Sequence, residues 1–196
     1  MMAIIKKVKR DGKRVTVTLA GEGPDETLCL GATLWEGLGL AEGDLPDRES
    51  EEKLRRASAL SETVTDAMRI AAGSPHSVSA LVMKLTRRGH AKEDAVRAVR
   101  ALTAGGLLDE AENARHTARS IFGRTKRGPA RIYADLLAKG YPAAAAKDAA
   151  DGITEEEYEE ALRYHAARRD FGGDPKTVAA LCRLGFSISK IKEITK

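Results

Sequence analysis

Aromatic side chains are scarce in this sequence. Phenylalanine, tryptophan and tyrosine make up 4% of its 196 residues, whereas alanine is abundant. Sandwiches and barrels of β-strands usually depend on aromatic and β-branched side chains for their cores. A thin core between alanine-rich helices therefore suits this composition better, and a chain of this length is long enough to bury one.

Cysteine is nearly absent, and the two that occur, Cys29 and Cys182, are too few and too far apart for a disulfide framework. No apolar segment at the start resembles a secretion signal. No stretch approaches the roughly 20 apolar residues that a membrane span needs. We therefore expect a cytoplasmic protein in a reducing compartment, without membrane contact.

The residue patterns that enzymes and cofactor sites require are also missing. The four histidines do not fall at the spacing of metal ligands, and no glycine-rich phosphate loop follows a strand. The acidic run at 155–157 occupies a predicted helix start, where negative charge is favourable, so we do not interpret it as a catalytic pair. We predict a protein that is not an enzyme and has no metal site and no cofactor.

Acidic side chains are scarce in one part of the chain. Residues 115–139 contain seven basic side chains and a single carboxylate, that of Asp135. Residues 111–150 hold eight basic and three acidic side chains, whereas residues 1–50 hold seven and nine. The formal charge of +4 is therefore unevenly distributed, and an anionic partner is expected to meet mainly the middle of the chain.

The first 50 residues contain the only β-like patterns. Two apolar runs flank an Asp-Gly turn signal at residues 10–13, which predicts a hairpin, and residues 27–30 add a third strand. One short helix is predicted at residues 33–38. We interpret its Trp35 as an anchor for this small sheet rather than as a residue that stacks on a base.

From residue 51 onward the hydrophobic pattern has the period of a helix. Its cap and stop signals define three predicted three-helix repeats, at residues 51–107, 108–152 and 153–196. Ser77 caps the second helix of the first repeat, Asp109 caps the first helix of the second, and Thr154 with Glu157 forms a capping box at the start of the third.

Apolar spacing within the repeats predicts the core-facing side chains. In the long first helix these are Leu60, Val64, Ala67, Met68 and Ala71. Later helices are expected to turn Val96, Leu137 and Ile188 inward, each with its apolar neighbours at helical spacing. In the second repeat, the helix that Asp109 caps is predicted to end near Phe122. Residues 123–128 then form a basic connector before a helix that begins at Pro129.

The second helices of the three repeats can be aligned. They share the form Leu-x-x-x-Gly-ring, at Leu85-x-x-x-Gly89-His90, Leu136-x-x-x-Gly140-Tyr141 and Leu181-x-x-x-Gly185-Phe186. Helical arrays with periods of this length stack so that each repeat touches mainly its neighbours. We therefore predict a mainly α-helical fold, in which tandem three-helix repeats form an elongated array next to a small N-terminal β-hairpin or β-sheet.

The basic run is the binding surface that we predict. Its residues are Arg115, Arg119, Arg124, Lys126, Arg127 and Arg131, to which we add Arg87, Arg88, Arg168 and Arg169 at late-helix positions. The partner could supply acidic side chains, or DNA phosphates, whose binding weakens steeply with salt. The alternative is a solvated charged face. For the late-helix pairs, that alternative is complementation of the carbonyl end of a helix, worth about 0.3–1 kcal/mol.

Several motifs occur in a fixed order along the chain. They are Ser77-x-x-x-Leu81, Leu85-x-x-x-Gly89, Gly106-Leu107-Leu108-Asp109-Glu110, Gly128-x-x-Arg131-Ile132-x-x-x-Leu136-x-x-x-Gly140 and Leu181-x-x-x-Gly185-Phe186-Ser187. With this set, nearly the whole sequence resembles the RecX family of recombination regulators. It departs from the family at Asn113 and Thr117, where aromatic residues are expected, and at His76 and Ala80, which replace an Arg and a Glu.

This resemblance implies a non-enzymatic cytoplasmic protein that binds the RecA recombinase filament on single-stranded DNA. Such a protein lies in the helical groove of the filament and limits strand exchange and repressor cleavage, in DNA repair and the SOS response. Weak, unselective DNA binding is a further expectation. The sequence has no long heptad repeat of the kind that forms a dimeric coiled coil, so we expect a monomer.

Two alternatives remain open. A helical transcription regulator could place residues 77–89 or 128–140 in a major groove as a recognition helix, which predicts sequence-selective duplex binding by the protein alone. An α-repeat scaffold could instead bind an unrelated acidic protein.

Overall fold

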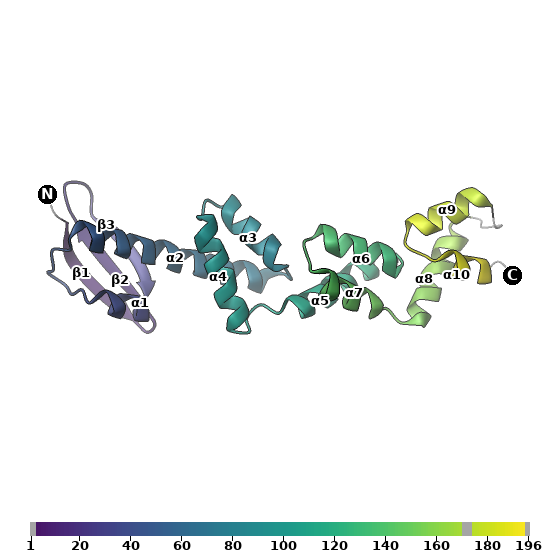
Figure 1. Cartoon of the computed structure of the whole chain (residues 1–196), viewed down its shortest axis with the longest axis horizontal. Helices are drawn as coiled ribbons and strands as arrows, with labels where there is room; N and C mark the ends of the chain where they lie inside the picture. Colours follow the sequence, from purple (N-terminus) through teal and green to yellow (C-terminus); the bar gives the residue numbers. More distant parts are fainter. Residues whose placement is uncertain (1–2, 170–173, 195–196) are drawn as a thin grey trace. The chain divides into compact units, whose positions relative to one another are not determined.

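The computed structural model describes residues 3–169 and 174–194 (Figure 1). Over these ranges the chain forms three strands and ten helices and is mainly α-helical, as predicted. Contacts divide it into two compact units. The first unit consists of residues 1–70 and 82–107, and the second unit consists of residues 71–81 and 108–196. The repeat boundaries drawn from the sequence stay predictions.

The elements follow one another in the predicted order. The sheet region contains β1 (Ile4–Asp11), β2 (Arg14–Ala20), β3 (Glu26–Gly31) and α1 (Ala32–Leu38). The helices that follow are α2 (Arg48–Gly73), α3 (Val78–Arg87), α4 (Lys92–Ala104), α5 (Glu110–Thr125), α6 (Pro129–Ala138), α7 (Ala143–Asp151), α8 (Glu155–Ala167), α9 (Pro175–Arg183) and α10 (Ile188–Glu193).

The sheet is a three-stranded antiparallel meander in the order β1-β2-β3. Asp11 pairs with Arg14 across a turn in which Gly12 has φ +56°, so the predicted hairpin is confirmed. The exposed fraction of Trp35 is only 3%, and Trp35 packs with Leu54 of α2 against the apolar residues of the sheet. The anchoring role predicted for this tryptophan is therefore confirmed.

Side chains and a loop satisfy the two edges of the sheet. At the β3 edge, the backbone amides of Cys29 and Gly31 donate to the hydroxyl oxygens of Ser58 (3.0 Å) and Ser61 (3.2 Å) of α2. At the β1 edge, the amide of Ile5 donates to the carbonyl of Asp44 at 2.9 Å. These bonds hold α2 along the sheet and remove edge amides that could pair with another strand.

The inward face of α2 differs from the prediction. Its buried residues are Leu54, Ser58, Thr63, Ala67 and Ile70, whereas the exposed fraction of Met68 is 48%. Two hydroxyl side chains are buried because they make hydrogen bonds, that of Ser58 to β3 and that of Thr63 to His90. An apolar count misses such positions. Of the predicted residues, Ala67 is buried, Leu60, Val64 and Ala71 are partly buried, and Met68 alone was predicted wrongly.

Three further side chains predicted to face inward are exposed: Val96 by 47%, Leu137 by 40% and Ile188 by 55%. For Val96 the physical reason is that α4 is covered only along a narrow stripe, which contains Ala95, Ala98, Val99 and Leu102.

The aligned ring residues all contact the first helix of their own three-helix group. The His90 Nδ1 lies 2.9 Å from the Thr63 hydroxyl of α2, and the Tyr141 hydroxyl lies 2.9 Å from the Thr117 hydroxyl of α5. The Phe186 ring packs edge-to-face on the Tyr158 ring of α8. The Tyr141 hydroxyl also donates to the Asn113 carbonyl at 3.3 Å. The Tyr141 hydroxyl is therefore bonded by the Thr117 side chain and the Asn113 backbone carbonyl, at two positions where the sequence departs from its family.

Two equivalent joints occur in the second unit, each a hydrogen bond between the residue that precedes one helix and the end of a later helix. The Ser77 hydroxyl, before α3, donates to the Lys139 carbonyl at 2.8 Å, next to Gly140 at the end of α6. The Gly128 amide, before α6, donates to the Leu184 carbonyl at 2.8 Å, next to Gly185 at the end of α9. Position 128 aligns with 77 and position 185 with 140, so the repeat found in the sequence is also a repeat of contacts.

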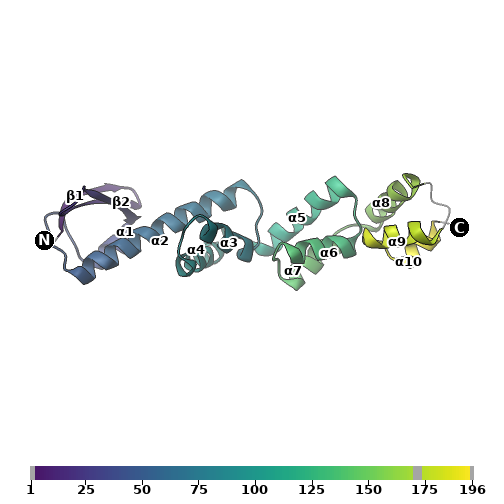
Figure 2. The ribbon, with the colours of Figure 1, turned by 90° about the horizontal axis from the view of Figure 1, so that it is seen from above.

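The end of α5 lies further along the chain than predicted. Asp109 caps this helix by accepting from the Glu112 amide at 2.9 Å, as expected, but the helix continues past Phe122 to Thr125. Lys126 then ends it with φ +49°. Arg124 therefore lies in the last turn of α5 and not on the predicted connector. In Figure 2, α5 lies along one side of α6 and α7.

Candidate anion-binding site

Four of the predicted binding residues in the second unit are paired with carboxylates. Arg115 pairs with Glu112 and Asp148, Arg119 with Glu157, and both Arg127 and Arg131 with Asp135. A carboxylate within hydrogen-bond distance cancels most of the field that a distant anion would feel. These arginines therefore connect elements of the second unit.

Arg119 illustrates this structural role. Its Nη1 lies 2.7 Å from both carboxylate oxygens of Glu157, and its Nη2 donates to the Gly152 carbonyl at 2.6 Å. Glu157 also completes the capping box of α8 with Thr154, which confirms that prediction. The hydrogen bond from Arg119 and the one from the Thr154 amide lower the pKa of the Glu157 carboxyl. Arg119 thus fastens α5 to the start of α8.

Asp135, the single carboxylate of the basic run, serves two arginines. The Nη1 of Arg127 lies 2.7 Å from one of its oxygens and the Nε of Arg131 lies 3.1 Å from the other. The exposed fraction of the Asp135 side chain is only 19%. Partial burial strengthens such pairs, so Asp135 holds the guanidinium groups of Arg127 and Arg131 and keeps them from a partner.

The other predicted residues of the second unit meet in one hollow. Arg124 and Lys126 at the end of α5 and Arg168 and Arg169 at the end of α8 line a hollow of about 380 Å³. The remaining lining residues are Gly123, Thr125, Tyr164 and His165. Among the described residues, four cations and no carboxylate therefore line it.

Neutral groups hold these four cations. The Arg168 guanidinium lies 5.3 Å from the centre of the Tyr164 ring, and Lys126 lies over Phe122 at 5.1 Å. The Arg124 Nε donates to a backbone carbonyl within α5 at 3.1 Å. In the part of the chain that the structure describes, none of the four makes an ion pair with a carboxylate. The hollow is therefore the place in the second unit where the predicted positive charge stays uncompensated.

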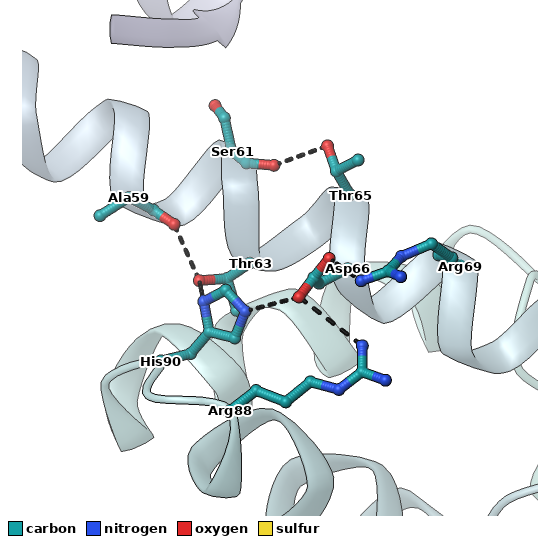
Figure 3. Close-up of polar contacts among 8 residues, drawn as sticks. All are labelled: Ala59, Ser61, Thr63, Thr65, Asp66, Arg69, Arg88 and His90. Atoms are coloured by element: carbon teal, nitrogen blue, oxygen red, sulfur yellow. Dashed lines mark hydrogen bonds and ion pairs between the residues drawn. The ribbon is translucent and has the colours of Figure 1, made fainter.

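Arg87 and Arg88 belong to the first unit. Arg88 lies 3.8 Å from the Asp66 carboxylate, which also accepts from His90 and Arg69 (Figure 3). Among the described residues, Arg87 makes no ion pair. This first pair thus contributes to a local polar cluster, whereas Arg168 and Arg169 line the hollow.

Two residues of the hollow, Tyr164 and His165, were not predicted. Each contacts the arginine four positions later: the Arg168 Nη1 donates to the Tyr164 hydroxyl at 3.0 Å, and the Arg169 Nη1 lies 3.4 Å from the His165 Nδ1. Spacing of four on a helix places side chains on one face. This i, i+4 pattern was the available signal.

Other kinds of site are not found. Among the described residues, no group of three or more His, Cys, Asp or Glu side chains could hold a metal ion. No helix in the described ranges combines the length and apolar character that crossing a membrane requires. The fold and the hollow together define a helical-repeat protein with a preformed cationic site.

Comparison with known proteins places the chain in a family. It is 32% identical over 132 residues to the regulatory protein RecX of Chromohalobacter salexigens, covering 65% of this chain and 86% of that protein. The chain belongs to the RecX family. No family model matches the sequence.

Solved structures support the same fold. A crystal structure of regulatory protein RecX superposes with a TM-score of 0.78 at 20% identity, over 98% of this chain and all of the other. The crystal structure of RecX from Lactobacillus salivarius gives a TM-score of 0.60 at 20% identity, over 70% of this chain and 95% of that one. The helical repeat fold is thus shared with RecX structures.

Proposed function

We propose that this protein regulates recombination by binding the filament that a RecA-type recombinase forms on single-stranded DNA. Binding limits strand exchange and repressor cleavage, and the protein acts as a ligand rather than as a catalyst. Membership in the RecX family supports this proposal, because the curated relative is named a regulatory protein.

The single observation that carries the proposal to specific residues is the uncompensated charge of the hollow. A recombinase filament on DNA is a polyanion of phosphates and acidic side chains. A concave cluster of cations without neighbouring carboxylates attracts such a partner and accelerates its association. Of the predicted residues, Arg124, Lys126, Arg168 and Arg169 therefore make the contact in our proposal, while the paired arginines hold the second unit together.

The test adds purified protein to recombinase assembled on single-stranded DNA and follows ATP hydrolysis and strand exchange. Wild-type protein, at amounts stoichiometric with the filament, is expected to reduce both. The triple variant Arg124→Glu, Lys126→Glu, Arg168→Glu is expected to lose the effect while its far-ultraviolet circular dichroism stays unchanged. No response to the wild type would refute the proposed function.

A matched control separates the hollow from the overall charge. Arg56, Arg97 and Arg100 are exposed residues of the first unit, on α2 and α4. Replacing these three by Glu changes the net charge by the same amount and is expected to leave inhibition largely intact. If both triple variants lose the effect equally, net charge and not the hollow determines binding.

A further inference from the structure

His165 connects the two sides of the hollow. Its Nε2 lies 3.1 Å from the Thr125 carbonyl oxygen at the end of α5, and its Nδ1 lies 3.4 Å from the Arg169 Nη1 at the end of α8. The ring itself lines the hollow. One side chain thus contacts both helix ends that supply the cations.

The partners of the ring determine where its proton lies. A carbonyl oxygen only accepts, so the Nε2 must carry a hydrogen; a guanidinium only donates, so the Nδ1 must offer its lone pair. The tautomer with its hydrogen on Nε2 satisfies both contacts. The same Arg169 Nη1 also donates to the His165 carbonyl at 3.0 Å, which holds the guanidinium back along its own helix.

The surroundings of His165 are strongly cationic. Its own helix α8 contributes Arg168, Arg169 and the Tyr164 hydroxyl, and the end of α5 contributes Arg124 and Lys126. From the third helical group, the ring of Phe186 packs on it at 5.9 Å between centroids and is uncharged. An anion in the hollow would lie against these cations and the imidazole together.

We propose that the hollow binds a phosphate-type oxyanion, the phosphodiester backbone of a nucleic-acid strand, and that binding is coupled to the uptake of one proton from solvent by His165. Once protonated at Nδ1, the ring no longer accepts from Arg169. Both the Nδ1 hydrogen and the released guanidinium then donate to the anion. His165 is thus a positioning residue for Arg169 in the empty hollow and a fifth donor in the occupied one.

A phosphate group fits this donor set for a geometric reason. Its oxygens accept from several guanidinium and ammonium groups at once, and arginine binds them through two parallel hydrogen bonds. A phosphodiester also keeps its charge over the whole range in which histidine titrates. The inference rests on the proposed function for its biological ligand, the DNA strand of the filament, but the chemistry is testable without the recombinase.

Thermodynamic linkage between proton uptake and anion binding gives the expected result. If the oxyanion favours protonated His165, then binding takes up a proton and affinity must rise as pH falls. Couplings between two sites are typically 5-fold to 150-fold, so we expect oligothymidylate to bind at least about fivefold more tightly at pH 6 than at pH 8. The proton taken up should also make the binding enthalpy depend on the ionisation enthalpy of the buffer.

The experiment titrates the full-length protein with a ten-residue oligothymidylate at pH 6, 7 and 8 by calorimetry, in two buffers at constant ionic strength. Sulfate, whose charge is constant over this range, is the second arm. Sulfate competition at millimolar concentration with the same pH dependence identifies a site for oxyanions in general. Binding that is seen only with the oligonucleotide identifies a site for the strand.

Two variants make the test specific. His165→Gln keeps an amide donor for the Thr125 carbonyl and is expected to bind with little pH dependence. His116→Gln removes a histidine of α5 whose side chain is 65% exposed, and should keep the full dependence. Nitrogen-15 NMR of the imidazole, with and without sulfate, reports the proton directly even if His165→Gln folds poorly.

The outcomes separate the inference from the proposed function. Wild-type affinity that is the same at pH 6 and pH 8, an unprotonated ring in the complex, or an undiminished pH dependence in His165→Gln each overturn the inference. None of these results bears on the proposed function, because inhibition of the recombinase is measured at a single pH. Conversely, proton-linked oligothymidylate binding without filament inhibition would leave the inference standing and refute the function.

Discussion

Arg119 of α5 and Glu157 of α8 are 38 positions apart in the sequence, yet the Nη1 of the arginine lies 2.7 Å from both oxygens of the carboxylate. This pair shows why positive charge in a sequence is not yet a binding surface. Arg119 and Arg124 look equivalent in the basic run. In the structure, Arg119 connects two helices, and Arg124 lines a hollow in which none of the described lining residues is a carboxylate.

Replacing Arg119 by Ala is expected to destabilise the second unit, because it breaks the pair with Glu157 and the bond to the Gly152 carbonyl. Both side chains are partly exposed, so a loss of about 0.5–1.5 kcal/mol is expected for the pair and the carbonyl bond together. Urea unfolding followed by circular dichroism measures it. Arg124→Ala, the matched control, should stay within about 0.5 kcal/mol of wild type. Equal losses in both variants would contradict the distinction.

Asp66 predicts how the first unit responds to acid. Its hydrogen bond with His90, and then the one from Arg69, lower the pKa of this carboxyl (Figure 3). A lowered folded-state pKa contributes stability above the unfolded value of about 3.9, and that stability is lost as pH falls through the folded-state value. Asp66→Asn should therefore be less stable than wild type at pH 6 and show a smaller further loss between pH 5 and pH 3.

Trp35 fluorescence measures this effect, because the only tryptophan of the chain lies in the first unit. Urea unfolding is recorded at each pH for wild type and for Asp66→Asn. Asp11→Asn, at an exposed position of the hairpin, is the control and should keep the acid dependence of the wild type. An Asp66→Asn variant with an unchanged acid slope would show that another carboxylate dominates.

Gly128→Ala is expected to disrupt the joint between α6 and α9. A Cβ atom at position 128 would lie 2.3 Å from the Gly185 carbonyl oxygen, a distance at which the backbone must move. Overpacking of this kind typically costs about 1–3 kcal/mol, and we expect a loss at the upper end because the Gly128–Leu184 hydrogen bond is also broken. Chemical unfolding followed by circular dichroism measures the loss.

Gly123→Ala is the matched control for this joint. Gly123 lies within α5, and nothing is within 4 Å of the position of an added Cβ. Alanine is favoured over glycine in a helix, so this variant should be more stable by roughly 0.5–1 kcal/mol. Opposite signs for the same substitution at two nearby glycines are the expected result, and a loss in both would argue against the joint.

Tyr141→Phe tests the hydrogen bonds between the Tyr141 hydroxyl and α5. It removes the contact with Thr117 and the bond to the Asn113 carbonyl, at an expected cost of about 1 kcal/mol. Burial raises the pKa of the Tyr141 hydroxyl, so wild-type protein should lose stability as pH rises past the ordinary range of tyrosine, and the variant should lose less. Tyr133→Phe is the control, since no hydrogen bond of the Tyr133 hydroxyl is found among the described residues.

Local signals predicted the fold well. The Asp-Gly turn and the caps at Asp109 and Thr154 are all confirmed. Each depends on residues a few positions apart, which local chain geometry brings together. The inward face of α2 was predicted incompletely because Ser58 and Thr63 are buried by bonds to residues 27–29 positions away.

The candidate site was half predicted. The four cations of the hollow were in the predicted set because they are basic, and the family resemblance was visible in the order of motifs. Their separation from the paired arginines was not predictable, since Arg115, Arg119 and their partners Asp148 and Glu157 are 33 and 38 positions apart. Two partner carboxylates are close in sequence to the basic run: Glu112, three positions before Arg115, and Asp135, which was taken as a sign of scarcity rather than as a partner.

The sequence by itself determined the helical class, the sheet region, the three aligned Leu-x-x-x-Gly-ring segments and the surplus of positive charge in the middle of the chain, because these follow from composition and from spacing within one or two turns. The tertiary structure alone decided which cations keep their charge available. A guanidinium attracts a partner only if folding has not already placed a carboxylate against it, and that depends on contacts between helices.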